Sequence, residues 1–171
     1  MIVFDLDQTL VDTSPVADLR KAGKWSGVMR RVPNLPAFEG ITPLIAELHT
    51  VGERMAIVTK SPDMVARAFV AQNGWPIDII VGYHQVRRRK PDPEGLLLAL
   101  ERAGADPADS FHVGDRAEDT EASRAAGMRA LGAAWGIDDE AELRSSNPDR
   151  VFATVADLRG FLLRSLGPTA R

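Results

Sequence analysis

Short apolar runs alternate with segments of helical periodicity along almost the whole chain. The expected strands are residues 1–5, 54–59, 78–82, 111–114 and 128–133, with a minor edge strand at 151–154. The expected helices are residues 43–51, 62–73, 92–104, 117–126 and 155–166. Because a strand, a helix and the next parallel strand connect in a right-handed crossover, this order predicts a mostly parallel sheet with helices on both faces. The predicted fold class is therefore α/β, of the doubly wound kind.

The size and composition of the chain fit one globular domain. Its 171 residues suffice for one substantial core, so we expect a single domain over residues 1–171. No apolar run is long enough to span a bilayer and no signal-peptide core precedes the first strand, so we expect a cytoplasmic protein without membrane contact. The absence of cysteine excludes disulfides, thiolate metal sites and cysteine nucleophiles. Residues 167–171 are expected to be frayed.

The first expected strand runs directly into two aspartates, Asp5 and Asp7. Side chains two residues apart in an extended segment share one side, so these carboxylates can converge. At the carboxyl end of a strand, where open α/β sheets bind ligands, two carboxylates repel each other unless a cation or a proton separates them. Mg²⁺, which prefers oxygen ligands, is the cation that this pair favours. In the alternative interpretation, one aspartate caps the following helix and the other lies on the surface.

Three later segments carry further polar residues at strand ends or helix starts. Thr59 ends the strand 54–59, Lys90 lies before the helix 92–104, and Asp115 and Asp119 follow the strand 111–114. Each has an ordinary explanation: a packed β-branched residue, a solvated lysine, and acids that complement a helix dipole. Taken singly, none of these segments indicates a site.

In the order Asp-x-Asp-x-Thr, Thr, Lys and Gly-Asp-x-x-x-Asp, the four segments together resemble the signature of the haloacid dehalogenase superfamily of phosphohydrolases. The resemblance covers about the first 130 residues. The stretches 90–94 and 114–127 look most like the phosphoglycolate phosphatase branch, which often has glycine at the position of Gln8. The resemblance implies a Rossmann-like core and a phosphatase that hydrolyses phosphate monoesters.

The resemblance also implies a covalent mechanism that uses a magnesium ion. Asp5 would be the nucleophile and form an aspartyl-phosphate, which divides the reaction into two steps. Mg²⁺ would be held by the Asp5 carboxylate, the backbone carbonyl of Asp7 and Asp115, with Asp119 acting from the outer shell of the metal. Asp7 would protonate the leaving oxygen and then activate water.

The phosphate-binding roles implied by the resemblance fall on Thr59 and Lys90. Thr59 would donate a hydrogen bond to the phosphoryl oxygens, and Lys90 would balance the charge of nucleophile and phosphate. The histidines have no part in this scheme. We expect His112 to be a partly buried strand residue, and His49 and His84 to lie on the surface.

Residues 13–38 form an insert after the first expected strand. A helix is predicted to begin at Ser14 and to end at Pro33. Relatives with a full cap carry a four-helix lid at this position, whereas this insert has room for little more than one helix. The interval from Thr59 to Lys90 is also too short for the second type of lid. We therefore expect a much reduced cap and an open site, and the sequence does not say whether the insert or a second subunit of a homo-oligomer closes it.

Basic residues gather in the insert and before Lys90, although the formal net charge of the chain is −3. They are Arg20, Lys21, Lys24, Arg30 and Arg31 in the insert, and Arg87, Arg88 and Arg89 in the later loop. A positive mouth would steer a substrate with negative charge beyond its scissile phosphate. The alternative is that these are solvated surface charges.

The sequence as a whole predicts a Mg²⁺-dependent phosphatase with an open site. Its expected substrate is an anionic phosphorylated small molecule, a nucleotide or a nucleic-acid end. A phosphotransferase or phosphomutase on the same scaffold is the nearest alternative, although it would need a lid that excludes water from the intermediate. A non-catalytic phosphate-binding regulatory module is the other, because function depends on the site and not on the fold.

Overall fold

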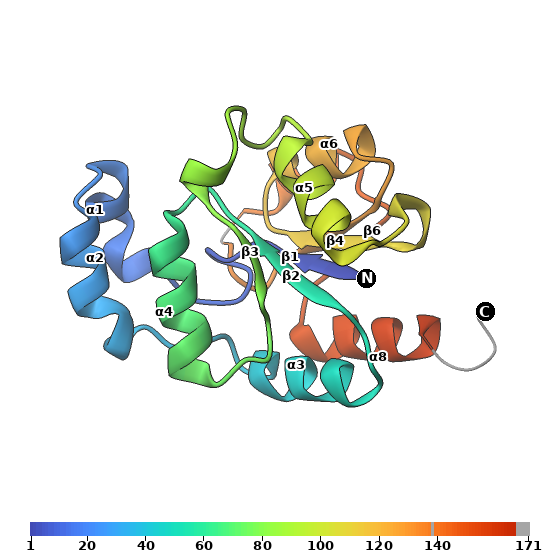
Figure 1. Ribbon diagram of the computed structural model, residues 1–171, viewed down its shortest axis with the longest axis horizontal. Helices are drawn as coiled ribbons and strands as arrows, with labels where there is room; N and C mark the ends of the chain where they lie inside the picture. The colour runs from blue at the N-terminus through green and yellow to red at the C-terminus, as the bar shows by residue number, and fades with distance from the viewer. Residues whose placement is uncertain (138, 167–171) are drawn as a thin grey trace.

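A six-stranded parallel sheet forms the centre of the molecule (Figure 1). The computed structural model describes residues 1–137 and 139–166, so the expected fraying of residues 167–171 lies outside the described residues. The strands lie in the order β3-β2-β1-β4-β5-β6. Their bounds are β1 Ile2–Phe4, β2 Met55–Val58, β3 Ile79–Val81, β4 Phe111–Gly114, β5 Arg129–Ala133 and β6 Arg150–Phe152. The predicted α/β doubly wound fold is confirmed, and the expected minor strand is the edge strand β6.

Helices connect the strands in the predicted alternation. The α-helices of the core are α3 Ile41–Thr50, α4 Asp63–Asn73, α5 Glu94–Ala103, α6 Ala117–Ala125, α7 Ala141–Ser145 and α8 Val155–Ser165. Short 3₁₀ turns lie at η3 Tyr83–Gln85 and η4 Pro107–Asp109. None of the helices in the described part of the chain is long and apolar enough to cross a membrane.

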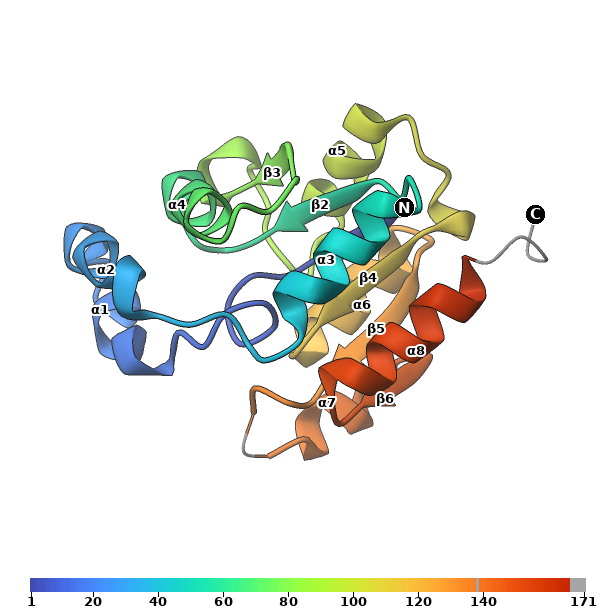
Figure 2. The same ribbon diagram turned by 90° about the horizontal axis from the view of Figure 1, so that it is seen from below.

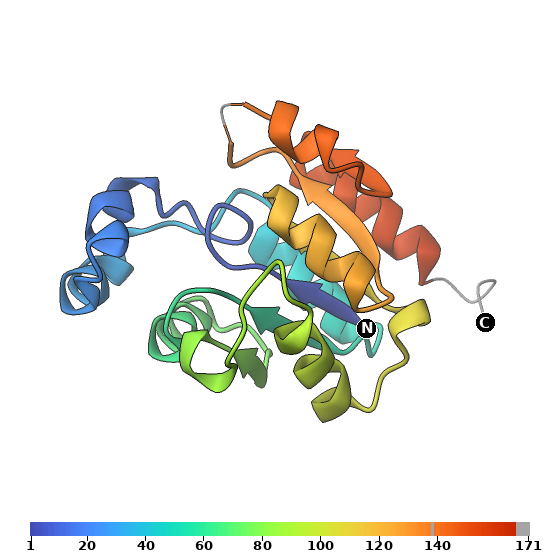
Figure 3. The same ribbon diagram turned by 90° about the horizontal axis from the view of Figure 1, so that it is seen from above.

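Side chains that alternate along the strands belong to two hydrophobic clusters, one on each face of the sheet. In β1, Ile2 and Phe4 belong to one cluster and Val3 to the other, which is the period-two pattern of a strand buried on both faces. The first cluster contains buried residues of α3, α4 and α8, and Figure 2 shows α3 and α8 side by side there. The second contains buried residues of α5 and α6, which cover the opposite face in Figure 3.

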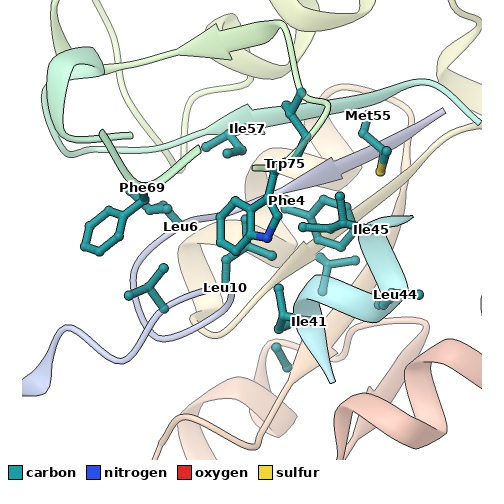
Figure 4. Close-up of a cluster of buried hydrophobic side chains, with 14 of the residues drawn as sticks. Phe4, Leu6, Leu10, Ile41, Leu44, Ile45, Met55, Ile57, Phe69 and Trp75 are labelled. Atoms are coloured by element: carbon teal, nitrogen blue, oxygen red, sulfur yellow. The ribbon is translucent and has the colours of Figure 1, made fainter. Parts of the chain in front are cut away.

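The larger cluster also holds the chain immediately after β1. Phe4, Leu6 and Leu10 are fully buried and lie among side chains of α3 and Trp75 (Figure 4). The indole of Trp75 donates a hydrogen bond to Thr42 Oγ1 at 3.0 Å. Because Leu6 continues the inward alternation of Phe4, its neighbours on either side are directed away from this core. The two aspartates after β1 are therefore fixed by the burial of the residue between them.

The position of β1 in the sheet determines where a ligand site can form. The chain passes from β1 to β2 and β3 on one side and then crosses to β4 on the other. This reversal of direction leaves a crevice at the carboxyl ends of β1 and β4, which is where doubly wound sheets bind ligands. The insert leaves the sheet at the same edge, between β1 and α3.

The insert contains two short helices, and not the single helix predicted from the sequence. The elements are η1 Ser14–Val16, α1 Ala17–Lys21, α2 Trp25–Arg31 and η2 Val32–Asn34. The helical path breaks at Gly23, whose φ of 66° is left-handed and incompatible with a continuous helix. Val28 of α2 is buried, and α2 contacts α4, beside which it lies in Figure 1. The insert thus packs against α4.

Candidate active site

The structure brings the six predicted site residues to one edge of the sheet. Asp5 and Asp7 follow β1, Thr59 follows β2 and Asp115 follows β4. Every one of the six is less than a tenth exposed: Asp5, Asp7, Thr59, Lys90, Asp115 and Asp119. A cavity of about 580 Å³ is lined by four of them, Asp5, Asp7, Lys90 and Asp119. Asp115 lines an adjoining cavity of about 320 Å³, and Thr59 reaches the site through its contact with Asp7.

Lys90 connects two of the buried aspartates. Its Nζ lies 2.6 Å from Asp5 Oδ1 and 2.6 Å from Asp119 Oδ1, and it donates a hydrogen bond to the Val58 carbonyl at 3.1 Å. Burial alone lowers the pKa of Lys90, but the carboxylates of Asp119 and Asp5 raise it above its ordinary value. The lysine is therefore a permanent positive charge, and its loop contributes a fixed cation to the end of β1.

The carboxylates of the site outnumber its buried cation. Burial raises the pKa of Asp5 to about 8; Lys90 opposes this shift, while Asp119, Asp115 and Asp7 add to it. Burial, followed by the charge of Asp119, raises the pKa of Asp115 to about 7. Burial is the largest influence on Asp119 and raises its pKa, but Lys90, His112 and the hydrogen bond from the Arg116 N–H together hold this pKa below its usual value. The negative charge left at Asp5 and Asp115 needs a further cation or a proton.

The donor set fits a hard divalent cation in part. Asp115 Oδ1 accepts a hydrogen bond from Thr9 Oγ1 at 3.2 Å, and its Oδ2 is buried without a hydrogen-bond partner in the described structure. Asp119 Oδ1 contacts Lys90, and its Oδ2 accepts from the backbone N–H of Arg116 at 3.0 Å. Within residues 1–137 and 139–166, no three His, Cys, Asp or Glu side chains are grouped as a metal site. A cation here would therefore need a backbone carbonyl or water besides the Asp5 and Asp115 carboxylates.

The carboxylate of Asp7 is held by one of its two oxygens. Oδ2 accepts hydrogen bonds from Ser61 Oγ at 2.7 Å and Thr59 Oγ1 at 3.3 Å, and lies 2.7 Å from Arg20 Nη2. Oδ1 is buried and has no hydrogen-bond partner in the part of the chain that the structure describes. The carboxylate is thus oriented while one oxygen stays available to exchange a proton.

Sequence reasoning missed the role of Ser61. Ser61 is not among the predicted site residues, yet its hydroxyl donates to Asp7 Oδ2, while α4 begins at Asp63 with Pro62 at the N-cap. Thr59 Oγ1 in turn accepts from the backbone N–H of Ser61 at 3.0 Å. The only signal in the sequence was a hydroxyl two residues after Thr59.

Gln8 links the insert to the loop after β5. Its φ of 63° lies in the left-handed region, which explains why glycine suits this position. Its amide nitrogen donates to the Gly136 carbonyl at 2.9 Å, and its amide oxygen accepts from the backbone N–H of Thr13 at 2.8 Å. The glutamine side chain therefore ties together two segments that flank the site.

Only some of the basic residues predicted to surround the entrance of the site lie at the cavity. Arg20 and Lys21 of the insert line it, whereas Arg87, Arg88 and Arg89 do not. Arg88 pairs with Asp92 at 2.8 Å, and Arg89 donates to the Tyr83 carbonyl. The arginines before Lys90 are therefore structural or surface charges in this arrangement.

The histidines lie outside the cavity lining. His112 is fully buried, more so than predicted, and its Nδ1 lies 2.8 Å from Ser123 Oγ. Burial, aided by Lys90, lowers its pKa to about 4, so it is neutral. His49 and His84 are exposed, as predicted.

Comparison with known proteins shows the family to which the chain belongs. The family model of haloacid dehalogenase-like hydrolases matches residues 18–133. A phosphoglycolate phosphatase of Xylella fastidiosa is 38% identical over 101 residues, covering 58% of this chain and 44% of that protein. The pyrophosphatase PpaX of Bacillus velezensis is 34% identical over 123 residues, covering 71% of this chain and 57% of that protein. The chain therefore spans about half the length of these curated relatives.

The fold is also shared with solved structures. A HAD family hydrolase of Deinococcus radiodurans, with bound phosphate and sodium, superposes with a TM-score of 0.79 at 20% identity. The match covers 96% of this chain and 95% of that one. At this level of identity the likeness concerns the fold alone.

Proposed function

The chain belongs to the haloacid dehalogenase-like hydrolase family, and on this premise we propose that it is a Mg²⁺-dependent phosphatase acting through an aspartyl-phosphate on Asp5. The observation that carries the proposal is the Lys90 ammonium, 2.6 Å from both Asp5 and Asp119 at the carboxyl end of β1. Catalysis of phosphoryl transfer is mostly positioning and charge neutralisation. A buried carboxylate beside a fixed cation supplies both.

In the first half-reaction, an oxygen of the Asp5 carboxylate attacks phosphorus while the bond from phosphorus to the ester oxygen breaks. Lys90 offsets the charge that would otherwise repel the incoming phosphate from Asp5. The leaving oxygen takes a proton from Asp7 and departs as an alcohol. Asp7 is suited to this step because its Oδ2 is held by Ser61 while its Oδ1 is unpartnered among the described residues.

In the second half-reaction, Asp7, now a carboxylate, takes a proton from a water molecule whose oxygen attacks phosphorus. The bond between phosphorus and Asp5 breaks, which releases inorganic phosphate and restores the Asp5 carboxylate. Asp7 keeps the proton for the next leaving group. Thr59 holds Asp7 in the geometry observed here and would donate to the phosphoryl oxygens when substrate is present.

Mg²⁺ is the proposed cofactor, and when bound it would neutralise the phosphoryl oxygens and favour ionised Asp5. The residues suited to hold it are Asp5, the backbone carbonyl of Asp7, and Asp115 with its unpartnered Oδ2 in the described structure. Asp119 would act from the outer shell, because both of its oxygens are engaged.

We further propose that residues 1–171 work as one domain with residues 13–38 as a reduced cap. The cavity between cap and sheet is lined on the cap side by Ala17, Arg20, Lys21 and Trp25. Its volume of about 580 Å³ suits a phosphorylated small molecule. The names of the relatives from Xylella and Bacillus suggest small anionic phosphates of the phosphoglycolate and pyrophosphate kind.

The test is hydrolysis of a generic aryl phosphate by the purified chain with Mg²⁺ and with excess chelator. Activity should require the metal and should be lost in Asp5→Asn, whose circular dichroism should match that of the wild type. Full activity with chelator, or in Asp5→Asn, would refute the proposal. Phosphate transfer to an added sugar phosphate in preference to water would instead identify a phosphotransferase.

A further inference from the structure

One arginine of the insert reaches the catalytic aspartates. Arg20, in the last turn of α1, places Nη2 2.7 Å from Asp7 Oδ2 and donates from Nη1 to Thr13 Oγ1 at 3.0 Å. Its Nε is buried, and the described residues offer it no hydrogen-bond partner. An unpaired donor of a charged group in a buried position is costly unless a ligand satisfies it.

The other cations at the cavity wall differ from Arg20. Lys60 is bound to Glu118 at 2.8 Å, and Lys90 is shared by Asp5 and Asp119. Arg116 lies 3.7 Å from Asp115 and is largely exposed. Arg20 therefore combines three properties: a cavity position, partial burial and an N–H group still without a partner within the described structure.

The position of Arg20 indicates which part of a substrate it would meet. Lys90 contacts Asp5, the proposed nucleophile, whereas Arg20 contacts Asp7, the proposed proton donor to the leaving oxygen. Arg20 is thus on the side of the leaving group. A guanidinium presents several N–H groups in a planar fork, which matches a carboxylate or a phosphate better than a neutral group.

We propose that Arg20 is a specificity-determining residue that binds an anionic group, carboxylate or phosphate, carried by the leaving group close to the ester oxygen. The inference rests on the proposed phosphatase function and adds the residue that selects the leaving group. The preferred substrates are small phosphate esters of hydroxy acids, or compounds in which a second phosphate is the leaving group. Lys21, the next residue and also part of the cavity wall, adds positive charge on the same side.

If Arg20 had a purely structural role, its replacement would have a different effect. If Arg20 only orients Asp7 or docks the insert, its loss would slow every phosphate ester alike. If it binds the leaving group, its loss would affect anionic leaving groups selectively. A matched pair of substrates separates the two roles.

The substrates are carboxymethyl phosphate and 2-hydroxyethyl phosphate, which differ mainly in the carboxylate, with pyrophosphate as the phosphate-bearing arm. The variants are Arg20→Gln and, as a control, Arg31→Gln, an exposed insert arginine outside the cavity wall. In Arg20→Gln, kcat/KM for one or both anionic leaving groups should fall roughly 10- to 100-fold relative to the hydroxyethyl ester. A selective loss for carboxymethyl phosphate would identify a carboxylate as the anion that Arg20 binds, and a selective loss for pyrophosphate would identify a phosphate. Arg20→Lys should retain part of the preference, since it keeps the charge but loses the fork.

A binding measurement keeps this test separate from the phosphatase proposal. Calorimetry on Asp5→Asn gives the Kd of each intact compound without turnover, and the same selective loss is expected in Asp5→Asn with Arg20→Gln. Absence of hydrolysis by the wild type would refute the phosphatase, whereas selective binding through Arg20 would still be measurable. Equal losses for all compounds, no loss, or no binding of any compound would overturn the role of Arg20.

Discussion

The carboxyl edge of the sheet and the insert that covers it are built on different principles. At the edge, Lys90 pairs with Asp5 and Asp119 from two other segments of the chain, and all three charged groups are buried. In the insert, α1 has no buried residue, and Arg20 reaches the site from a partly exposed position. Buried, mutually paired charges tolerate little movement, whereas a lightly packed helix can vary its side chains without disturbing the core.

The difference suggests a division of labour between the two regions. The groups proposed for bond making and breaking stand on strand ends that both hydrophobic clusters hold in position. The groups proposed for choosing a leaving group, Arg20 and Lys21, lie on the short helix α1. The rigid carboxyl edge of the sheet holds the catalytic groups in an accurate geometry. The insert can change its side chains, and with them the substrate specificity, without disturbing that geometry.

The largest expected contrast comes from removing a lysine in each region. Lys90→Met would leave Asp5 and Asp119 buried without their cation, so unfolding free energy should fall by about 3–5 kcal/mol and kcat by about 10²–10³-fold. Lys24→Met, at an exposed insert position, should change stability by no more than about 0.5 kcal/mol. Urea denaturation and steady-state kinetics measure both. Equal effects of the two changes would contradict the contrast.

Asp7 lies where the two regions meet, and its replacement tests the role given to its free oxygen. Asp7→Asn should slow hydrolysis of an alkyl phosphate by about 10²–10⁴-fold, because the alkoxide needs a proton to leave. The loss should be smaller for an aryl phosphate, whose leaving group is more acidic. Single-turnover phosphorylation rates isolate this step. Equal losses on the two substrates would count against the proton-donor assignment.

Metal binding should depend on the edge and not on the insert. Mg²⁺ that binds only the folded chain would raise the unfolding free energy by about 2.7 kcal/mol at a hundredfold excess over Kd. Because burial raises the pKa values of Asp5 and Asp115 to about 8 and about 7, protons compete for these ligands, so the rise in Tm should be larger at pH 8 than at pH 5.

The same carboxylates set the sign of the metal-free pH dependence. Their pKa values are higher in the folded than in the unfolded chain, so their contribution to stability falls as pH rises from about 4 to about 8. Asp115→Asn should weaken the Mg²⁺-dependent shift in Tm, and Arg31→Gln in the insert should keep it. A full shift in Asp115→Asn would remove that residue from the metal site.

The smallest expected effect concerns two glycines with left-handed backbones. Gly23 breaks the insert and Gly52 follows α3, and a Cβ at either would meet no other atom within 4 Å. Gly52→Ala should lower the unfolding free energy by about 1 kcal/mol, the usual penalty for a side chain in this conformation. Gly23→Ala should lower it by less if the insert opens locally before global unfolding. Equal losses would show that insert and sheet unfold as one unit.

Much of the fold was predictable because local sequence patterns specify its strands and helices. Apolar runs and helix signals located the strands and main helices to within a few residues, since burial on both faces demands continuous apolar strands. The helix break at Gly23 was harder, because its apolar spacing alone resembles one continuous helix. The backbone conformation of a single glycine decided between one helix and two.

The sequence by itself determined which residues can meet at the edge, because strand ends in a parallel sheet converge wherever the alternation holds. The roles given to Asp5, Asp7, Thr59, Lys90, Asp115 and Asp119 come from the resemblance to the haloacid dehalogenase superfamily and remain proposals. Only the tertiary structure decided how they are partnered. Ser61 holds Asp7 across 54 positions of the chain, and Lys90 reaches Asp5 across 85.

The same limit applies to the basic residues, which look equivalent in the sequence. Arg20 lies at the cavity because α1 brings it to Asp7, whereas Arg88 pairs with Asp92 and Glu94 away from the cavity. Such choices depend on packing between distant segments, which no local pattern records. Local periodicity therefore determined the scaffold of this protein, and long-range packing determined the partners of its charges.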